Sequence, residues 1–185
     1  MNVIESHIKG VLIFEPKVFG DGRGFFMETW SRGRYKNAGL DVEFVQDNVS
    51  SSSQGVLRGL HYQNPQPQGK LVQVLQGEVL DVAVDIRVGS PTFGKVATCL
   101  LSDENRRQFY VPAGFAHGFC VLSETALFLY KCTAFYNAET EGGLLWNDPD
   151  LGIDWPAAEP NLSKKDANAP RLKDIPKENL PLYTV

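Results

Sequence analysis

Two of the three histidines in this 185-residue chain lie where an imidazole could do chemistry. His61 lies in the run Val56-Leu57-Arg58-Gly59-Leu60-His61-Tyr62-Gln63, and His117 follows Pro112 and Gly114 in a turn that enters an apolar run. An imidazole ordinarily has a pKa of about 6.5, so it can take up and return protons near neutral pH. Two imidazoles, helped at most by a stray carboxylate, are a thin ligand set for zinc or iron. So small a set of possible ligands favours His61 as a general base rather than a metal ligand.

The composition disfavours several classes of protein. There are 18 Lys and Arg residues against 22 Asp and Glu, a net charge of −4, whereas general nucleic-acid binders carry a basic surplus. No apolar run approaches the roughly 18 residues of a membrane span, and residues 1–7 lack the pattern of a secretion signal. Cys99, Cys120 and Cys132 are widely spaced within apolar runs, which favours buried free thiols. We expect a cytoplasmic protein that binds neither nucleic acid nor membrane.

The elements that must hold these side chains are strands. From residue 56 to 136 the dominant hydrophobic period is two, and in the segment 80–86 the apolar residues at even positions oppose Asp81, Ala83 and Asp85. Further runs at 95–101, 107–111, 118–122 and 126–136 are separated by turn residues. Short alternating strands without long helices between them predict an all-β fold of antiparallel sheets closed into a sandwich or barrel.

Helical patterns are short and peripheral. Residues 31–38, ended by Gly39, predict one short helix, and Ser163 to Asp166 has the spacing of a capping box before Pro170. No repeat, low-complexity tract or linker divides the chain. We predict one domain over residues 1–185, with a barrel core at about 40–136 and an irregular C-terminal wrap at 137–185.

The spacing from Pro112 to His117 resembles the second sequence motif of the cupin superfamily, whose small barrels present this histidine to the interior. The alternative is a histidine bonded to a turn carbonyl. A metal-binding cupin would carry a second histidine two residues after the first, where this chain has Gln63. The resemblance therefore implies a cupin-type jelly roll without a metal.

A more specific resemblance covers nearly the whole chain, in order from about residue 3 to residue 170. The segments that carry it are Phe19–Phe26, Phe44–Asn48, Leu57–His61, Asp81–Arg87, Ser90–Gly94, Gly114–Phe119 and Leu162–Asp166, and they resemble the dTDP-4-dehydrorhamnose 3,5-epimerase family. This resemblance implies an isomerase that needs no cofactor. It would convert dTDP-4-dehydro-6-deoxy-D-glucose to dTDP-4-dehydro-L-rhamnose in dTDP-L-rhamnose biosynthesis, by removing a proton beside the 4-keto group and returning one from the opposite face.

The resemblance also implies catalytic roles. His61 matches the base, Asp166 the carboxylate that orients it, and Tyr130 the acid, while Lys70 and His117 match residues near the keto oxygen. Spacing alone leaves other interpretations open: Asp166 as part of a helix cap, Lys70 as a solvated strand end, and Tyr130 as a core residue.

A further group matches positions at which the family holds its sugar nucleotide. These substrate-binding candidates are Arg23, Phe26, Glu28, Gln46, Asp47, Asn48, Arg58, Lys70, His117, Tyr136, Glu141 and Lys165. Arginine suits a diphosphate because its guanidinium can bind two oxygens at once, and thymine needs an aromatic slot, for which Phe19, Phe26 and Tyr136 are candidates. The alternative for any single surface arginine is a solvated charge.

Arg58 and His61 are three residues apart, so a regular strand would aim them at opposite faces. If both reach one pocket, Gly59 should mark a bulge or twist in the strand. We predict such an irregularity there.

Several alternatives remain. The resemblance implies a homodimer that exchanges N-terminal strands, with which the apolar segment Gly10–Phe14 is compatible. A relative that inverts only one carbon of a dTDP-4-keto-6-deoxyhexose would carry the same base and acid. A metal-dependent cupin enzyme and a sugar-binding barrel without catalysis are more distant alternatives.

Overall fold

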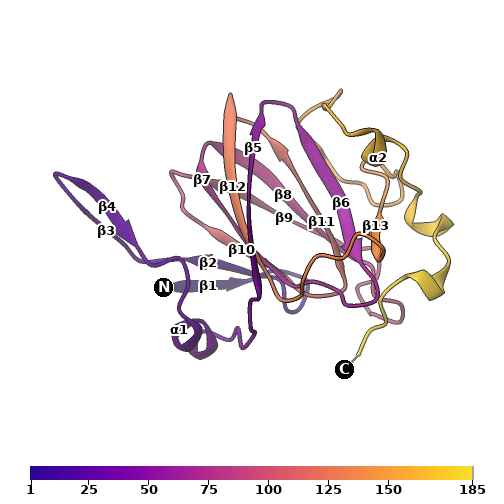
Figure 1. The fold of residues 1–185 in the computed structure, drawn as a ribbon, viewed down its shortest axis with the longest axis horizontal. Helices are drawn as coiled ribbons and strands as arrows, with labels where there is room; N and C mark the ends of the chain where they lie inside the picture. Colours follow the sequence, from indigo (N-terminus) through magenta and orange to yellow (C-terminus); the bar gives the residue numbers. More distant parts are fainter. Residues whose placement is uncertain (185) are drawn as a thin grey trace.

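The computed structural model describes residues 1–184, and its regular elements are mostly antiparallel strands (Figure 1). One sheet has six strands in the order β1 (Asn2–Glu5), β2 (Leu12–Glu15), β10 (Gln108–Val111), β7 (Lys70–Gln76), β12 (Thr125–Cys132) and β5 (Gln46–Ser53). The other has five, in the order β13 (Glu141–Gly143), β6 (Leu57–Gln63), β11 (Phe115–Val121), β8 (Glu78–Asp85) and β9 (Val96–Ser102). The predicted all-β, cupin-type fold is confirmed.

A buried apolar cluster joins the two sheets. Its members come from both, including Val72 and Phe128 of the six-stranded sheet and Val79 and Phe119 of the five-stranded sheet. The rings of Phe119 and Phe128 stack with their centroids 4.1 Å apart. Since this contact crosses between the sheets, it is part of what holds their inner faces together.

Both faces of β8 are buried, which differs from the apolar and polar faces expected for residues 80–86. Val82, Val84 and Ile86 pack against the C-terminal segment, whereas Ala83 lies in the cluster between the sheets. Asp81, on the same face as Ala83, is 0% exposed. The polar face is therefore the interior of the barrel, and the C-terminal segment covers the apolar one.

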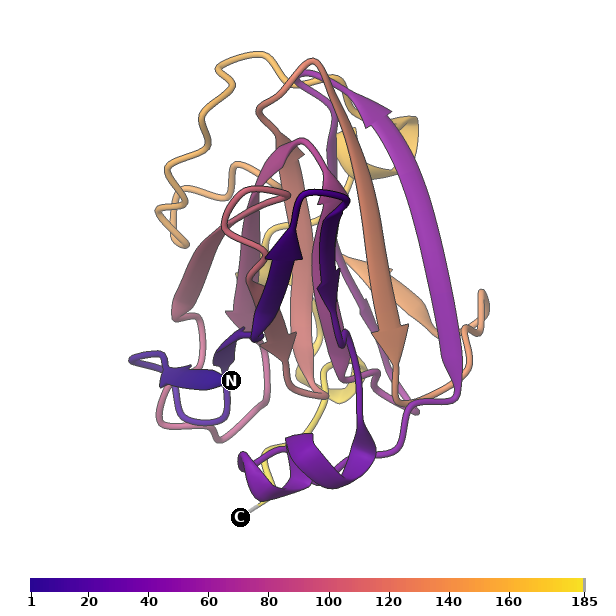
Figure 2. The ribbon, with the colours of Figure 1, turned by 90° about the vertical axis from the view of Figure 1, so that its left-hand side faces the viewer.

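The helices and the C-terminal segment lie outside the barrel, as predicted. They are α1 (Arg32–Asn37), α2 (Lys164–Ala167) and the 3-10 turns η1 (Leu172–Asp174) and η2 (Lys177–Asn179). The C-terminal segment runs beside β6 and β13, and α1 lies below the sheets (Figures 1 and 2). Within residues 1–184, no helix is long and apolar enough to cross a membrane.

Strand boundaries differ from the expected ones in three places. The run expected at 118–122 begins earlier, at Phe115, so His117 lies within β11 rather than in a turn before it. The run expected at 126–136 ends at Cys132. The polar segment Gln46–Ser53 was not expected as a strand, yet it pairs along its whole length with β12 and forms one edge of its sheet.

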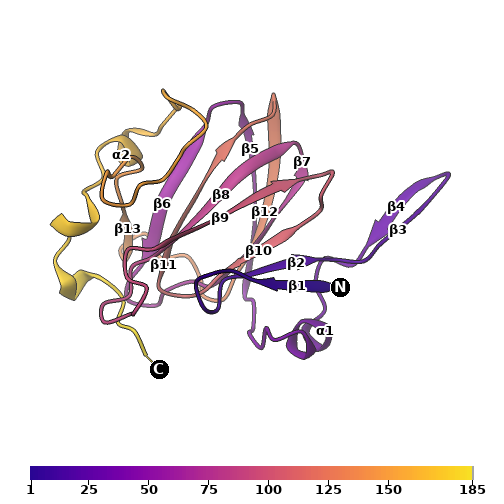
Figure 3. The ribbon, with the colours of Figure 1, turned by 180° about the vertical axis from the view of Figure 1, so that it is seen from behind.

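A two-stranded hairpin stands apart from the barrel. It is formed by β3 (Val18–Asp21) and β4 (Gly24–Met27), which pair with each other and project on the side opposite the C-terminal segment (Figures 1 and 3). Its rings are largely exposed, 54% for Phe19, 58% for Phe25 and 70% for Phe26. A single copy of the chain thus leaves this apolar surface uncovered.

Candidate active site

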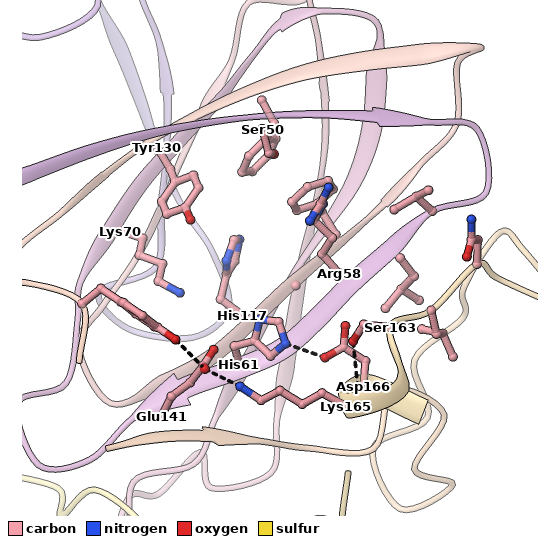
Figure 4. Close-up of a pocket in the computed structure, with 18 residues that line it drawn as sticks. Ser50, Arg58, His61, Lys70, His117, Tyr130, Glu141, Ser163, Lys165 and Asp166 are labelled. Atoms are coloured by element: carbon pink, nitrogen blue, oxygen red, sulfur yellow. Dashed lines mark hydrogen bonds and ion pairs between the residues drawn. The ribbon is translucent and has the colours of Figure 1, made fainter. Parts of the chain in front are cut away.

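A cavity of about 600 Å³ is lined by strands of both sheets and by residues 161–166 (Figure 4). Its walls carry most of the titratable side chains predicted to act, including His61, Lys70, Tyr130 and Asp166. A smaller space of about 270 Å³ shares His61, Lys70 and Tyr130 with it, so the two are parts of one site. The topology therefore gathers residues that lie far apart in the sequence.

His61 forms a close pair with Asp166. The ring Nε2 lies 2.6 Å from Asp166 Oδ1, and the aspartate is 5% exposed. Burial by itself raises the pKa of Asp166, but the hydrogen bond and charge of His61, with smaller contributions from the Ser163 side chain and the Gly59 backbone, outweigh it and hold that pKa below its usual range. The carboxylate is therefore charged at neutral pH and accepts the Nε2 proton. The lone pair on Nδ1 is then the one able to take a proton.

The helix cap and the His–Asp pair exist together. Ser163 is the N-cap of α2, and its Oγ accepts a hydrogen bond from the Asp166 backbone N–H at 3.1 Å. The backbone of Asp166 thus completes the cap while its side chain bonds His61. The predicted cap is therefore confirmed, the contact with His61 exists beside it, and the cap fixes the direction in which the carboxylate points.

Gly59 lets Arg58 and His61 reach the same cavity. The pairing of β6 with β11 shifts register here: His61 lies opposite His117, but Arg58 lies opposite Phe119. Gly59 has φ +123°, and a Cβ at this position would lie 2.6 Å from the Cα of Gly118. Only glycine fits both the conformation and the close approach. The predicted irregularity is confirmed.

His117 belongs to a second buried His–Asp pair. Its Nε2 lies 2.9 and 3.1 Å from the two carboxylate oxygens of Asp81, and the side chains are 7% and 0% exposed. The expected alternative, a turn carbonyl as partner of His117, is wrong. Asp81 was not predicted as a site residue, although a carboxylate at the centre of a strand of alternating apolar residues was the available signal.

Lys70 and Tyr130 point into the cavity (Figure 4). Burial lowers the pKa of the Lys70 ammonium, opposed by Cys132, Asp81 and Glu141. Lys70 does begin β7, but it is half-buried and lines both parts of the cavity, so it is not a fully solvated strand end. Burial raises the pKa of the Tyr130 phenol, which is thus protonated at neutral pH. Its ring packs beside the buried Phe128 with centroids 6.0 Å apart, as expected for a side chain on the inner face of β12.

Arg58 and Lys70 are cations available to a ligand. Neither forms a salt bridge with another residue of the described chain. Arg58 Nε donates to Ser52 Oγ at 3.0 Å, which orients the guanidinium and leaves its terminal nitrogens for an anion. Ser52 was not predicted, because a serine in a run of serines carries no distinguishing signal.

Glu141 connects two other predicted residues of the cavity wall. It accepts a hydrogen bond from Tyr136 Oη at 3.0 Å and is paired with the ammonium of Lys165. Burial raises the pKa of Glu141, but the bonds from Lys165 and Tyr136 more than offset this and lower it overall. Gln46 and Asn48 line the smaller space, where Gln46 Nε2 donates to Asn48 Oδ1 at 3.0 Å.

Four predicted substrate-binding residues lie away from this cavity. Arg23 and Phe26 are on the projecting hairpin, where Arg23 pairs with Asp21, and Glu28 pairs with Arg34. Because the hairpin extends away from the barrel, these residues do not line the cavity of their own copy of the chain, and their role in substrate binding stays a prediction.

The fourth is Asp47, which binds Lys131 Nζ at 2.8 and 2.9 Å. Strand alternation turns Asp47 to the face of β5 opposite Gln46 and Asn48, and it lines neither part of the cavity. A direct contact of Asp47 with a ligand in this cavity is therefore not supported by its position, and its role in substrate binding stays a prediction.

The described residues, 1–184, contain no group of three or more His, Cys, Asp or Glu side chains placed to hold a metal ion. Gln63, at the position where a metal-binding cupin would carry a histidine, is 3% exposed and hydrogen-bonds to backbone groups instead.

Comparison with known proteins gives consistent results. A family model described as dTDP-4-dehydrorhamnose 3,5-epimerase matches residues 5–174. A curated protein of that name from Shigella flexneri is 58% identical over 176 residues, which are 94% of this chain and 97% of the relative. A crystal structure of a dTDP-6-deoxy-D-glucose-3,5-epimerase from Legionella pneumophila Philadelphia 1, in complex with dTDP-4-keto-L-rhamnose, is 55% identical with a TM-score of 0.97, and the match covers 100% of this chain and 99% of that one.

A crystal structure of a 3′-monoepimerase from Streptomyces bikiniensis, in complex with dTDP-quinovose, is also similar. It is 37% identical with a TM-score of 0.90, and the match covers 96% of this chain and 92% of that one. The fold is thus shared between enzymes described as inverting two carbons and one described as inverting a single carbon.

Proposed function

The chain belongs to the dTDP-4-dehydrorhamnose 3,5-epimerase family, and we propose that the His61–Asp166 pair and Tyr130 perform its reaction from opposite faces of the sugar. The reaction converts dTDP-4-dehydro-6-deoxy-D-glucose to dTDP-4-dehydro-L-rhamnose. One observation carries the assignment of roles. An imidazole oriented by a buried carboxylate and a protonated phenol line the same cavity as Lys70, which forms no salt bridge within residues 1–184.

The proton transfers follow from these groups. His61 Nδ1 takes the proton from a carbon beside the ketone, and the electron pair of that C–H bond moves to the keto oxygen. The resulting enolate is stabilised by the Lys70 ammonium and by His117, whose ring is held by Asp81. Tyr130 then gives its phenolic proton to the other face of the carbon, which inverts it. Solvent water then takes the proton from the His61 imidazolium and returns one to the Tyr130 phenolate, which resets both groups. The same exchange at the second of carbons 3 and 5 completes the reaction.

The nucleotide part of the substrate needs cations and an aromatic surface. Arg58 is the candidate for the diphosphate, since Ser52 orients its guanidinium without neutralising it. Tyr136 offers its ring for stacking of thymine, and Glu141 and Lys165 extend the polar wall beside it. Gln46 and Asn48 add amide groups in the adjoining space.

Two further proposals concern the setting of the enzyme. It forms a homodimer in which each hairpin reaches the other copy and brings Arg23, Phe26 and Glu28 toward that copy's cavity. The exposed rings of Phe19, Phe25 and Phe26 support this, because isolated chains rarely present such apolar surface to water. It works in the cytoplasm, in keeping with three buried cysteines that are all free thiols.

Proton exchange tests the catalytic proposal. With the 4-keto sugar nucleotide in heavy water, proton NMR should show loss of the carbon-bound protons at positions 3 and 5 together with formation of the L-rhamno product. His61→Asn should abolish exchange at both carbons while dTDP still binds. Exchange at one carbon alone would assign the chain to the single-inversion type, and undiminished exchange in His61→Asn would remove His61 as the base.

A further inference from the structure

The segment Ala134–Asn137, between β12 and β13, is held by glutamine side chains at four successive residues. The hydrogen bonds are Gln68 Nε2 to Ala134 O at 2.8 Å, Gln63 Nε2 to Phe135 O at 3.2 Å, Tyr136 N to Gln46 Oε1 at 2.9 Å and Asn137 N to Gln63 Oε1 at 2.9 Å. The three glutamines come from β5, from the end of β6 and from the loop between β6 and β7. We call Gln46, Gln63 and Gln68 the glutamine clamp.

The clamped segment has little else to hold it. Phe135 is 68% exposed and Tyr136 54% exposed, so neither ring anchors the segment in the core. A segment with few buried apolar contacts opens easily unless hydrogen bonds tie it down. The four hydrogen bonds to the glutamine side-chain amides therefore determine where the backbone of this segment lies.

Gln63 is the central member of the clamp. It is 3% exposed, and besides Phe135 and Asn137 it bonds Gln66, whose carbonyl accepts from Nε2 at 2.6 Å. Its side chain thus donates twice and accepts once. Among the uncharged side chains, only an amide supplies two donors and an acceptor at one position. Gln63 consequently joins the loop after β6 to the segment after β12.

The position of this segment determines the position of Tyr136. Tyr136 lines both parts of the cavity, and its hydroxyl donates to Glu141, which is paired with Lys165. A shift of the segment would move the Tyr136 ring and break its hydrogen bond to Glu141. The proton-transfer groups would not move with it, since Gln63 makes no hydrogen bond to His61, Lys70 or Tyr130.

We propose that Gln63 is a positioning residue that sets the affinity for the nucleotide by fixing Tyr136, and does not take part in proton transfer. This rests on the proposed function, in which the nucleotide of the substrate lies against Tyr136.

The test uses Gln63→Met, which keeps the length of the side chain and removes its hydrogen bonds. We expect the dissociation constant of dTDP, measured by calorimetry, and KM for the 4-keto sugar nucleotide to rise about tenfold, in line with the loss of one to two net hydrogen bonds. We expect kcat to fall by less than about threefold and its pH profile to keep its shape. Hydrogen exchange of the Asn137 amide should become faster.

Gln54→Met is the matched control. Gln54 also donates from Nε2 to a backbone carbonyl, that of Leu122 at 2.8 Å, but it lines neither part of the cavity. Its replacement should leave the affinity for dTDP unchanged. If Gln63→Met does not fold, Gln68→Met removes only the bond to Ala134 and should raise the same dissociation constant by a smaller factor.

A double-mutant cycle decides whether Gln63 acts through Tyr136. In a Tyr136→Ala background, Gln63→Met should change the dissociation constant by less than about twofold, because the ring it positions is gone. Additive effects would overturn the proposal. So would a Gln63→Met enzyme with a lower melting temperature but unchanged affinity, or one in which kcat falls while KM does not.

The wild-type chain separates this inference from the proposed function. If the wild type neither binds dTDP nor exchanges protons of the 4-keto sugar, the proposed function fails. If the wild type does both and Gln63→Met does so equally well, only the role of Gln63 fails.

Discussion

His61 and His117 lie directly opposite each other on the paired strands β6 and β11, and each ring is bonded through Nε2 to a different buried aspartate. Asp166 comes from the C-terminal helix α2, outside the barrel, whereas Asp81 comes from β8 on its inner face. The site therefore contains two oriented imidazoles side by side. We assign proton abstraction to His61 because the cavity reaches both members of its pair, His61 and Asp166, but does not reach Asp81.

Replacing Asp166 by Asn should greatly slow catalysis without preventing binding. The amide would present an N–H to Nε2, so the ring would carry its proton on Nδ1 and lose the lone pair assigned to proton abstraction. We expect kcat to fall by ~10²–10⁴-fold, the usual range for loss of a general base. Steady-state kinetics and dTDP calorimetry check this, and a kcat near that of the wild type would show that Asp166 is only a helix residue.

Replacing Tyr130 by Phe should separate exchange from inversion. The ring and its packing against Phe128 stay, but the proton donor is lost. Since His61 remains, protons beside the ketone should still exchange with heavy water, while formation of inverted product falls by ~10²–10⁴-fold. NMR follows both signals in one sample. If exchange disappeared together with inversion, Tyr130 would have to take part in proton removal as well.

The activity should decline in alkali at a pH below the usual range of lysine. Burial lowers the pKa of Lys70, so its ammonium is present below that pKa and is lost as pH rises through it. Burial raises the pKa of Tyr130, so the phenol does not produce this decline. A pH profile of kcat should show an alkaline limb, in which kcat falls with an apparent pKa below the ordinary lysine value of about 10.4.

In Lys70→Arg this alkaline limb should be absent, because a guanidinium stays protonated throughout the range. Lys70→Met should be slow at every pH, for lack of the cation that stabilises the enolate. An alkaline limb that persists unchanged in Lys70→Arg would assign the titration to another group.

Asp85 should contribute to stability in a pH-dependent way without affecting the chemistry. It is 0% exposed and accepts from Arg87, Ser90 and Thr92. Burial raises its pKa, but these bonds outweigh burial and lower it overall. A carboxyl whose pKa is depressed in the folded state stabilises the fold above its unfolded pKa of about 3.9, and this stability is lost as pH falls through the folded value.

We expect Asp85→Asn to lower the free energy of unfolding by about 3 kcal/mol at pH 7, as for breaking a buried ion pair. The difference from the wild type should shrink as pH falls below about 4. Urea unfolding at several pH values measures both effects. A constant difference across this range would mean that Asp85 acts through its shape and not through its charge.

Patterns of residues close together in the sequence predicted much of this structure. The period of two predicted the strands, because one face of each strand had to be apolar. The spacing of Ser163 and Asp166 predicted the cap of α2, and the three-residue step from Arg58 to His61 predicted the irregularity at Gly59. The strands and the cap depend on residues only a few positions apart, so they can be inferred without knowing the rest of the fold. The irregularity at Gly59 also needed the resemblance that assigns Arg58 and His61 to one pocket.

Other features had no local signal. The strand Gln46–Ser53 is polar on both faces, because its inner face lines the cavity and not the core, so no alternation marked it. Asp47 was assigned to the site with its neighbours, but strand alternation turns it to the outside. The hairpin carries Arg23 and Phe26 away from the cavity in the same chain, and its direction depends on how it leaves the barrel.

The sequence by itself determined the class of fold, the strand-rich core and the identity of most of the groups in the cavity. Only the tertiary structure decided that the Asp81 face of β8 is the interior, that Asp81 is the partner of His117, and that Gln63 holds the segment bearing Tyr136. The physical reason is that burial and hydrogen-bond partners depend on contacts between segments far apart in the chain. Periodicity says which side chains share a face, whereas packing decides what covers that face.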